Sequence, residues 1–166
     1  MNAAQLRDIQ EPLKARYREQ PGTALVTLKT KSRVGEGITC KIETGRSLAE
    51  AGLHPATGGD GLSVCSGDML LEALAACAGV TLRAVATAIE FDLQEALVHA
   101  EGDLDFRGTL SVDKNAPVGF KTIRLRFEIR TNETSDKIAT LIKLTERYCV
   151  VYQTLLQANP IQVSLG

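Results

Sequence analysis

The sequence contains few aromatic residues and no tryptophan. Its 166 residues include three tyrosines and four phenylalanines. We therefore expect a core of aliphatic side chains and alanine, and we do not expect the aromatic platforms on which nucleic-acid bases stack. The formal net charge is −1, and no block of like charges occurs. Neither nucleic acid nor an anionic membrane surface is therefore an expected partner.

The sequence also lacks the signals of secretion and of a metal centre. Its first 22 residues are charged and amphipathic, without the apolar run of a secretory signal, so we expect a cytoplasmic protein. Structural disulfides are then not expected among its four cysteines, which are Cys40, Cys65, Cys77 and Cys149. These dispersed cysteines and the two histidines do not have zinc-site spacing, so we expect no metal and no cofactor.

Hydrophobic periodicity and turn residues predict a single domain of mixed helices and strands. In chain order, the predicted elements are a helix over residues 3–18, strands over 24–33 and 38–44, a long helix over 66–89, antiparallel strands over 96–112 and 120–131, a helix over 135–148, a short helix over 149–157 and a strand over 161–165. Ser135 is the expected N-cap of its helix. The glycine-rich residues 54–64 predict a solvated loop. This order is typical of an α+β fold.

The long predicted helix has a cysteine at its centre, within the small-residue segment ALAACAG. One face is formed by Leu70, Leu74, Cys77, Thr81 and Val85. A helix that is apolar on most sides belongs in the centre of a structure. It is long enough to cross a membrane, but Glu72 and Arg83 interrupt it and favour a core helix instead. Cys77 is accordingly either a small buried hydrophobic residue or a nucleophile in a dry pocket.

The other notable thiol, Cys149, lies where one predicted helix gives way to the next. A cysteine in the first turn of a helix faces free backbone N–H groups and the positive end of the helix dipole. These groups lower a thiol pKa, which predicts a stabilised thiolate at Cys149. Sequence spacing does not pair Cys149 with Cys77, and two buried core thiols are the alternative.

Two segments together resemble the OsmC/Ohr superfamily. They are SGDMLLEALAACAG around Cys77 and RYCVVYQTLLQANPIQVSL around Cys149, separated by a strand pair and a helix. The resemblance runs from about Ala24 to the end of the chain, which leaves residues 1–22 as an N-terminal helical extension of a domain spanning 1–166. It implies antiparallel sheets wrapped around long central helices in an intertwined homodimer.

The activity that this resemblance implies is cysteine-based reduction of organic hydroperoxides in oxidative-stress defence. Cys77 would be the peroxidatic residue and would become a sulfenic acid, which Cys149 would resolve to a disulfide. A thiol or dithiol reductant would then restore both thiols. Arg33 matches the family arginine that stabilises the thiolate, and Asp68 matches the carboxylate that orients this arginine.

The sequence departs from the better-known peroxidase branches and looks closer to a less characterised one. Val150 stands where those branches have proline, and Asp68 stands at a slightly different offset from their glutamate. Asp68 is also about 13 Å from its own Cys77 along a straight helix. It would therefore act through Arg33 or from a second subunit, or it is only a favourable residue at a helix start.

Two other functions compete with peroxide reduction. A non-catalytic protein of this fold could bind a lipophilic small molecule in the same apolar pocket. Thiol–disulfide exchange with a protein partner is the third possibility, although the chain has no C-x-x-C motif.

Overall fold

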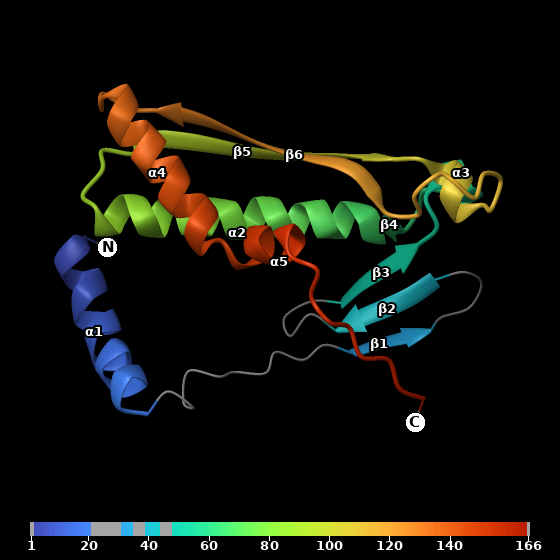
Figure 1. The fold of residues 1–166 in the computed structure, drawn as a ribbon, viewed down its shortest axis with the longest axis horizontal. Coiled ribbons are helices and arrows are strands. Elements are labelled where there is room, and N and C mark those ends of the chain that lie inside the picture. Colours follow the sequence, from blue (N-terminus) through green and yellow to red (C-terminus); the bar gives the residue numbers. More distant parts are fainter. Residues whose placement is uncertain (1, 21–30, 35–38, 44–47, 166) are drawn as a thin grey trace. The chain divides into compact units, whose positions relative to one another are not determined.

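The computed structural model describes residues 2–20, 31–34, 39–43 and 48–165 (Figure 1). The chain divides into two compact units. The first, here called the helical unit, comprises residues 1–13, 73–99 and 126–166. The second, here called the sheet unit, comprises residues 14–72 and 100–125. The described elements are a mixture of helices and strands, as the sequence predicts.

The first element is helix α1, Ala3–Glu19, which confirms the helix predicted at the N-terminus. A reciprocal pair of hydrogen bonds closes its first turn. The Gln5 N–H donates to Asn2 Oδ1 over 2.9 Å, and the Asn2 N–H donates to Gln5 Oε1 over 3.0 Å. This arrangement satisfies backbone donors that have no partner within the helix, in the manner of a capping box.

The sheet unit contains a four-stranded sheet in the order β1-β2-β3-β4. Strands β1 (Lys31–Val34), β2 (Thr39–Glu43) and β3 (Leu48–Gly52) are antiparallel, and β4 (Val64–Cys65) runs parallel to β3. The first two strands agree with the prediction where the structure describes them; residues 24–30 and the predicted turn at 35–37 lie outside the described part. The sequence did not predict β3, because LAEAG is built from residues with little preference for strands.

The predicted loop before the long helix contains one short helical turn, η2 (Pro55–Thr57). The Ala56 N–H donates to His54 Nδ1 over 3.0 Å and caps this turn. Gly58 ends it with a φ of 92°, a conformation that strains residues with a side chain. The rest of residues 54–63 lacks regular structure, as expected of a connection.

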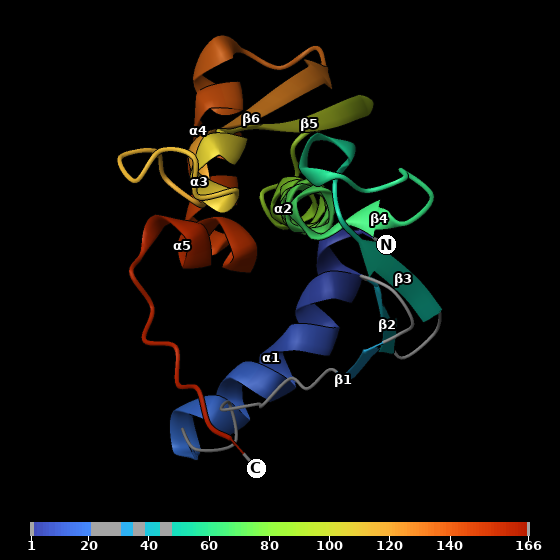
Figure 2. The ribbon, with the colours of Figure 1, turned by 90° about the vertical axis from the view of Figure 1, so that its right-hand side faces the viewer.

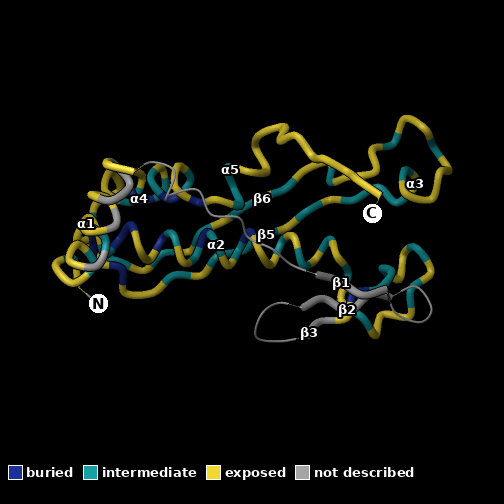
Figure 3. The backbone as a smooth tube through the Cα atoms, turned by 90° about the horizontal axis from the view of Figure 1, so that it is seen from below, coloured by how far each residue is buried: buried dark blue, intermediate teal, exposed yellow. Residues whose placement is uncertain are grey.

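The long helix α2, Ser66–Ala88, matches the predicted helix to within one residue. Its buried residues are Leu74, Ala78, Leu82, Val85 and Ala86. Together with Phe91, Leu93 and Leu141, the last three form the core of the helical unit. Figure 3 shows stretches of buried backbone colour along α2 and α4 (Ser135–Tyr148). Each fully buried leucine contributes about 1.5–3 kcal/mol, so this apolar contact fixes α4 against α2.

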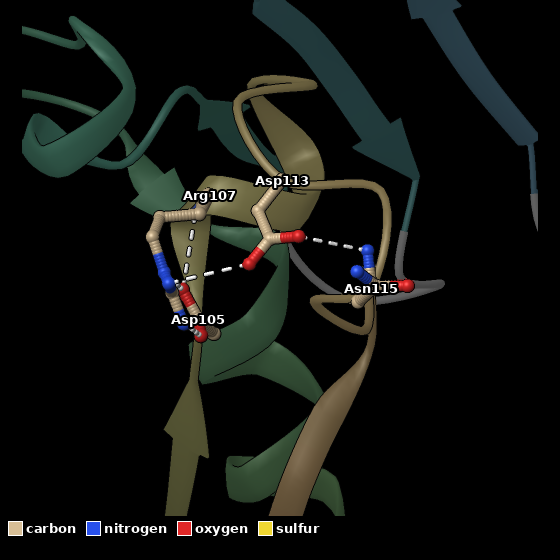
Figure 4. Close-up of polar contacts among 4 residues, drawn as sticks. All are labelled: Asp105, Arg107, Asp113 and Asn115. Atoms are coloured by element: carbon tan, nitrogen blue, oxygen red, sulfur yellow. Dashed lines mark hydrogen bonds and ion pairs between the residues drawn. The ribbon is translucent and has the colours of Figure 1, made fainter.

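Strands β5 (Glu95–Leu104) and β6 (Phe120–Arg130) pair in a two-stranded sheet. The prediction that the first of these strands continues to Val112 is wrong, because helix α3, Phe106–Thr109, follows it at once. Asp105 is the reason for the break. Its side chain accepts from the Arg107 N–H and pairs with the Arg107 guanidinium at 2.6 Å (Figure 4). An aspartate N-cap favours a helix start over a continued strand.

The C-terminal part of the chain is helix α4 followed by helix α5, Val150–Leu156. The expected inward face of α4 is confirmed, with Leu141 fully buried and Ile138, Ile142 and Leu144 packed against the core. The N-cap of α4 is Thr134, not Ser135, which is already helical. The strand predicted over Ile161–Leu165 is absent, and these residues are exposed. The alternating pattern is present there, but no described strand pairs with it.

Candidate functional site

The structure brings Cys77 and Cys149 together in the helical unit. Cys77 lies in the middle of α2 and is partly buried, whereas Cys149 is 1% exposed at the junction of α4 and α5. Both thiols are free, and each shifts the pKa of the other, which places the two side chains close together. Figure 2, which looks along α2, shows α5 to one side of this helix. The N–H groups of Val150 and Val151, at the start of α5, act on Cys77 in the middle of α2. The sequence alone did not establish this pairing.

The backbone at Cys149 explains how the junction presents donors to the thiols. Cys149 has extended φ and ψ values of −74° and 109°, which end α4 and start α5. Its own N–H completes α4 by donating to Thr145 O over 2.9 Å, and its carbonyl accepts from Gln153 N–H over 2.9 Å. The N–H groups of the first turn of α5 have no partner within that helix, and so they are free to bind sulfur.

The pKa of Cys77 lies below the ordinary value of a cysteine. Burial raises the pKa of this thiol, but four hydrogen bonds together outweigh that effect. In order of decreasing size, the donors are the Val151 N–H, the Cys149 thiol, the Val150 N–H and the Thr81 hydroxyl. These groups stabilise the thiolate, which is the reactive form of cysteine toward peroxides and disulfides.

The pKa of Cys149 is shifted in the opposite direction, which corrects the expectation from the sequence. Burial raises the pKa of Cys149 most strongly, and the Tyr152 N–H acts against it by lowering this pKa. Hydrogen bonding and charge from Cys77 raise the pKa again, and the Val151 N–H lowers it by the smallest amount, so that the net shift is upward. The start of α5 therefore supplies N–H groups to both sulfur atoms, but at Cys149 burial and the neighbouring Cys77 outweigh them, so the stabilised thiolate is at Cys77. Cys149 is the thiol that donates a hydrogen bond to it.

Arg33 and Asp68 belong to the sheet unit. Arg33 lies in β1, where it pairs with Lys41 of β2 in the strand ladder. Asp68 lies in the first turn of α2 and lines a cavity of about 360 Å³ together with His54, Cys65 and Phe120, among others. The roles assigned to Arg33 and Asp68 by resemblance stay predictions.

Reasoning from the sequence missed two contributors to the site. Backbone N–H groups of Val150 and Val151 have no signature in side-chain chemistry, although a cysteine before a short apolar helix was a signal that free amides would be near. Thr81 was placed on the same helical face as Cys77 but was not recognised as a partner of its sulfur.

Within the described residues, no group of three or more His, Cys, Asp or Glu side chains could hold a metal ion.

A second cavity lies beside Cys149. It has a volume of about 340 Å³ and is lined by Cys149 together with Arg147, Gln153 and Asn159, among others. All of its described lining residues come from the α4–α5 junction and the segment after α5. Arg147 is the charged residue among them, and its guanidinium lies 5.6 Å from the centre of the Tyr148 ring.

Comparison with models of protein families identifies the family of this chain. The family model described as OsmC-like protein matches residues 58–165, more than half of the chain and including both cysteines of the pair. The chain belongs to the OsmC-like family. This confirms the resemblance stated from the two cysteine segments. No curated protein sequence matches the chain.

Solved structures of OsmC-like proteins share the fold at low sequence identity. An OsmC-like protein from Mycoplasma pneumoniae superposes with a TM-score of 0.67 at 17% identity, over 80% of this chain and 89% of that one. An organic hydroperoxide resistance protein from Elizabethkingia anophelis gives 0.64 at 18% identity, over 81% and 91%. An organic hydroperoxide resistance protein OsmC from Legionella pneumophila gives 0.62 at 19% identity, over 79% and 90%. These similarities establish the fold.

Proposed function

We propose that this protein is a cysteine-based peroxidase that reduces organic hydroperoxides in oxidative-stress defence in the cytoplasm. The observation that supports it best is the contact between Cys77, whose pKa is lowered, and Cys149, which is buried beside it and donates to it. A thiolate next to a second thiol is the arrangement that a reversible peroxidase needs. Two of the structurally similar proteins are named organic hydroperoxide resistance proteins, which favours this substrate class.

The proposed catalytic cycle has three steps. The Cys77 thiolate attacks the terminal oxygen of the hydroperoxide, the O–O bond breaks, and the organic alkoxide leaves and takes up a proton as the alcohol. Cys77 is then a sulfenic acid, which the Cys149 sulfur attacks with loss of water to form a disulfide. An external thiol or dithiol, itself oxidised to a disulfide, returns both cysteines to thiols. No metal or other cofactor takes part.

The family arginine and carboxylate complete the proposed site. Arg33 would stabilise the Cys77 thiolate as a cation, and Asp68 would hold the arginine in position. We propose that these residues act within an intertwined homodimer. An exposed stripe of α2 supports an association through this helix, since Ala73, Ala76, Val80 and Ala84 lie three or four residues apart on it. Only 28% of the most apolar stretch of α2 is buried within one chain.

A thiol titration tests the proposed function. The reduced protein is treated with one equivalent of cumene hydroperoxide, and free thiols are counted before and after. We expect the rapid loss of two thiols per chain and their recovery with dithiothreitol. Cys77→Ser should abolish peroxide consumption, whereas Cys149→Ser should consume one equivalent and retain a sulfenic acid, detected by dimedone labelling and mass spectrometry. Thiol loss no faster than in the denatured protein would contradict the proposal and favour a non-catalytic binding protein.

A further inference from the structure

The cavity of about 340 Å³ beside Cys149, here called the Cys149 cavity, has one charged side chain among its described lining residues. This side chain is Arg147, and the others that line the cavity, such as Gln153 and Asn159, are uncharged. Beyond Arg147 the sequence contains no Asp, Glu, Lys, Arg or His. The volume lies in the range of sites for small molecules. The cavity therefore presents a positive charge to a small ligand, without a carboxylate to oppose it.

The guanidinium of Arg147 is available to an anion. Arg147 lies in the last turn of α4, and its guanidinium lies over the Tyr148 ring, 5.6 Å from the ring centre. Contact with the face of a ring does not use the N–H groups at the edge of the guanidinium. Among the described residues, no carboxylate forms an ion pair with Arg147. Its planar fork of N–H groups can therefore bind the two oxygens of a carboxylate.

Two side-chain amides hold the wall of this cavity in place. Gln153 Nε2 donates to Glu146 O over 2.9 Å, which ties α5 to the last turns of α4. Asn159 Nδ2 donates to Thr154 O over 2.7 Å and to Gln157 O over 3.0 Å, which fixes the segment that follows α5. These donors are bonded to the backbone of the wall itself. The charged donor of the cavity is therefore the group with which a ligand can pair.

Cys149 connects this cavity to the proposed catalytic cycle. Cys149 is 1% exposed, so an external thiol reaches its sulfur only through space that the protein leaves next to it. The Cys149 cavity is such a space, because Cys149 lines it, whereas Cys77 is not among its described lining residues. A reductant that enters here meets the Cys149 end of a Cys77–Cys149 disulfide. The charge of the cavity then selects which reductant enters.

We propose that the reductant is a small thiol that carries a carboxylate, which binds in the Cys149 cavity with this carboxylate on the guanidinium of Arg147. The proposal deepens the proposed peroxidase function and rests on it. The thiolate of the reductant attacks the Cys149 sulfur, the bond to Cys77 breaks, and Cys77 leaves as a thiolate. A second thiol attacks the reductant sulfur of this mixed disulfide, and Cys149 leaves and takes up a proton. Two thiols are thereby oxidised to a disulfide, and the protein disulfide is reduced to two thiols.

The test compares three small thiols of different charge as reductants of the protein disulfide. They are mercaptopropionate, which is anionic, mercaptoethanol, which is neutral, and cysteamine, which is cationic. The protein carries serine in place of Cys40 and Cys65, and its disulfide is formed beforehand with one equivalent of cumene hydroperoxide. The thiols that return are counted by acid quenching, alkylation and mass spectrometry. Because the three reductants also differ in thiol pKa, each is compared between protein variants and not with the other two.

We expect Arg147→Gln to slow reduction by mercaptopropionate about three- to fivefold relative to mercaptoethanol, and to favour cysteamine. Arg147→Lys should keep part of the preference for the anionic thiol, because it keeps the charge and loses the planar fork. Lys143→Gln is the matched control, since it removes a positive charge from α4 outside the described lining of the cavity. It should behave as the parent protein. Added salt should weaken the preference of the parent protein for the anionic thiol. A merely structural effect of Arg147→Gln would slow all three thiols alike.

The outcomes separate this proposal from the proposed function. If cumene hydroperoxide forms the disulfide and Arg147→Gln affects the three thiols alike, the class of reductant is wrong and the peroxidase function stands. If cumene hydroperoxide forms no disulfide, the peroxidase function is wrong. The disulfide is then formed with diamide, and the same comparison still tests whether the Cys149 cavity selects anionic thiols. If neither oxidant links Cys77 to Cys149, both proposals are overturned.

Discussion

Cys77 and Cys149 have pKa values that their surroundings shift in opposite directions. Cys77 receives hydrogen bonds from two backbone N–H groups, a thiol and a hydroxyl, and its pKa is lowered despite burial. Cys149 is more completely buried and lies next to a forming negative charge, so its pKa is raised. The lower pKa also makes Cys77 the better leaving group when the proposed disulfide is reduced. An external thiolate should accordingly attack the Cys149 sulfur, next to the cavity that this residue lines.

The proposed role of Arg33 leads to a prediction about the pH dependence of Cys77. Arg33→Ala should raise the Cys77 pKa, because removing a nearby cation destabilises the thiolate. Alkylation should therefore slow at neutral pH and recover as the pH rises. Arg33→Lys should rescue poorly, since lysine lacks the planar fork that can hold a carboxylate and a thiolate together. The measurement is the pH profile of alkylation in a protein that retains Cys77 as its only cysteine. An unchanged profile in Arg33→Ala would show that another cation serves the site, with Arg46 as the next candidate.

At the scale of elements, the sequence predicted best where a periodic pattern is long. Helices α2 and α4 were located to within a residue, because apolar positions repeat through several turns of each. Strand β3 was missed because alanine and glycine carry little strand preference. Helix α3 was missed because its start depends on a single aspartate cap. The site was only partly predictable for a related reason: the two cysteines were found through a family resemblance, whereas the backbone donors of α5 have no side-chain signature.

The cap of α3 makes a prediction about stability and pH. The hydrogen bond from the Arg107 guanidinium lowers the pKa of Asp105 to about 2, so the folded state stabilises its ionised form. This contribution is fully present above the ordinary aspartate pKa of about 3.9 and is lost as the pH falls toward about 2. Asp105→Ala should lower the urea midpoint near neutral pH, and its difference from wild type should shrink in acid. Asp105→Asn separates the two effects, since asparagine keeps the capping oxygen and loses the charge. If the difference in urea midpoint between Asp105→Ala and wild type does not change with pH, the Asp105–Arg107 ion pair contributes nothing to the stability of the fold.

At the scale of the whole molecule, the question is what covers the apolar residues that one chain leaves exposed. Val80 is 72% exposed on α2, beside the exposed Ala73, Ala76 and Ala84. Small residues in such a stripe let a second helix approach closely, and the same helix from another copy is the proposed neighbour. The C-terminal Ile161–Leu165 alternates apolar and polar residues without a described strand to pair with, and an intertwined partner would also supply one. If Arg33 and Asp68 act on the Cys77 of the other subunit, their proposed roles require this dimer.

Substitution of Val80 tests the assembly and its link to the site. The wild-type protein should be a dimer by light scattering at micromolar concentration, with an interface above roughly 2,000 Å², as is common for obligate dimers. Val80→Arg places a charge in the proposed helix contact, where it would be buried without a partner, and should give monomers. Val112→Arg is a matched control because Val112 is also 72% exposed but lies in the loop after α3, and it should leave the dimer intact. If Arg33 acts from the second subunit, adding Arg33→Ala to the monomeric Val80→Arg protein should leave its Cys77 pKa unchanged, whereas the same substitution in the dimer should raise it. A Val80→Arg protein that remains dimeric would exclude this face of α2 from the interface.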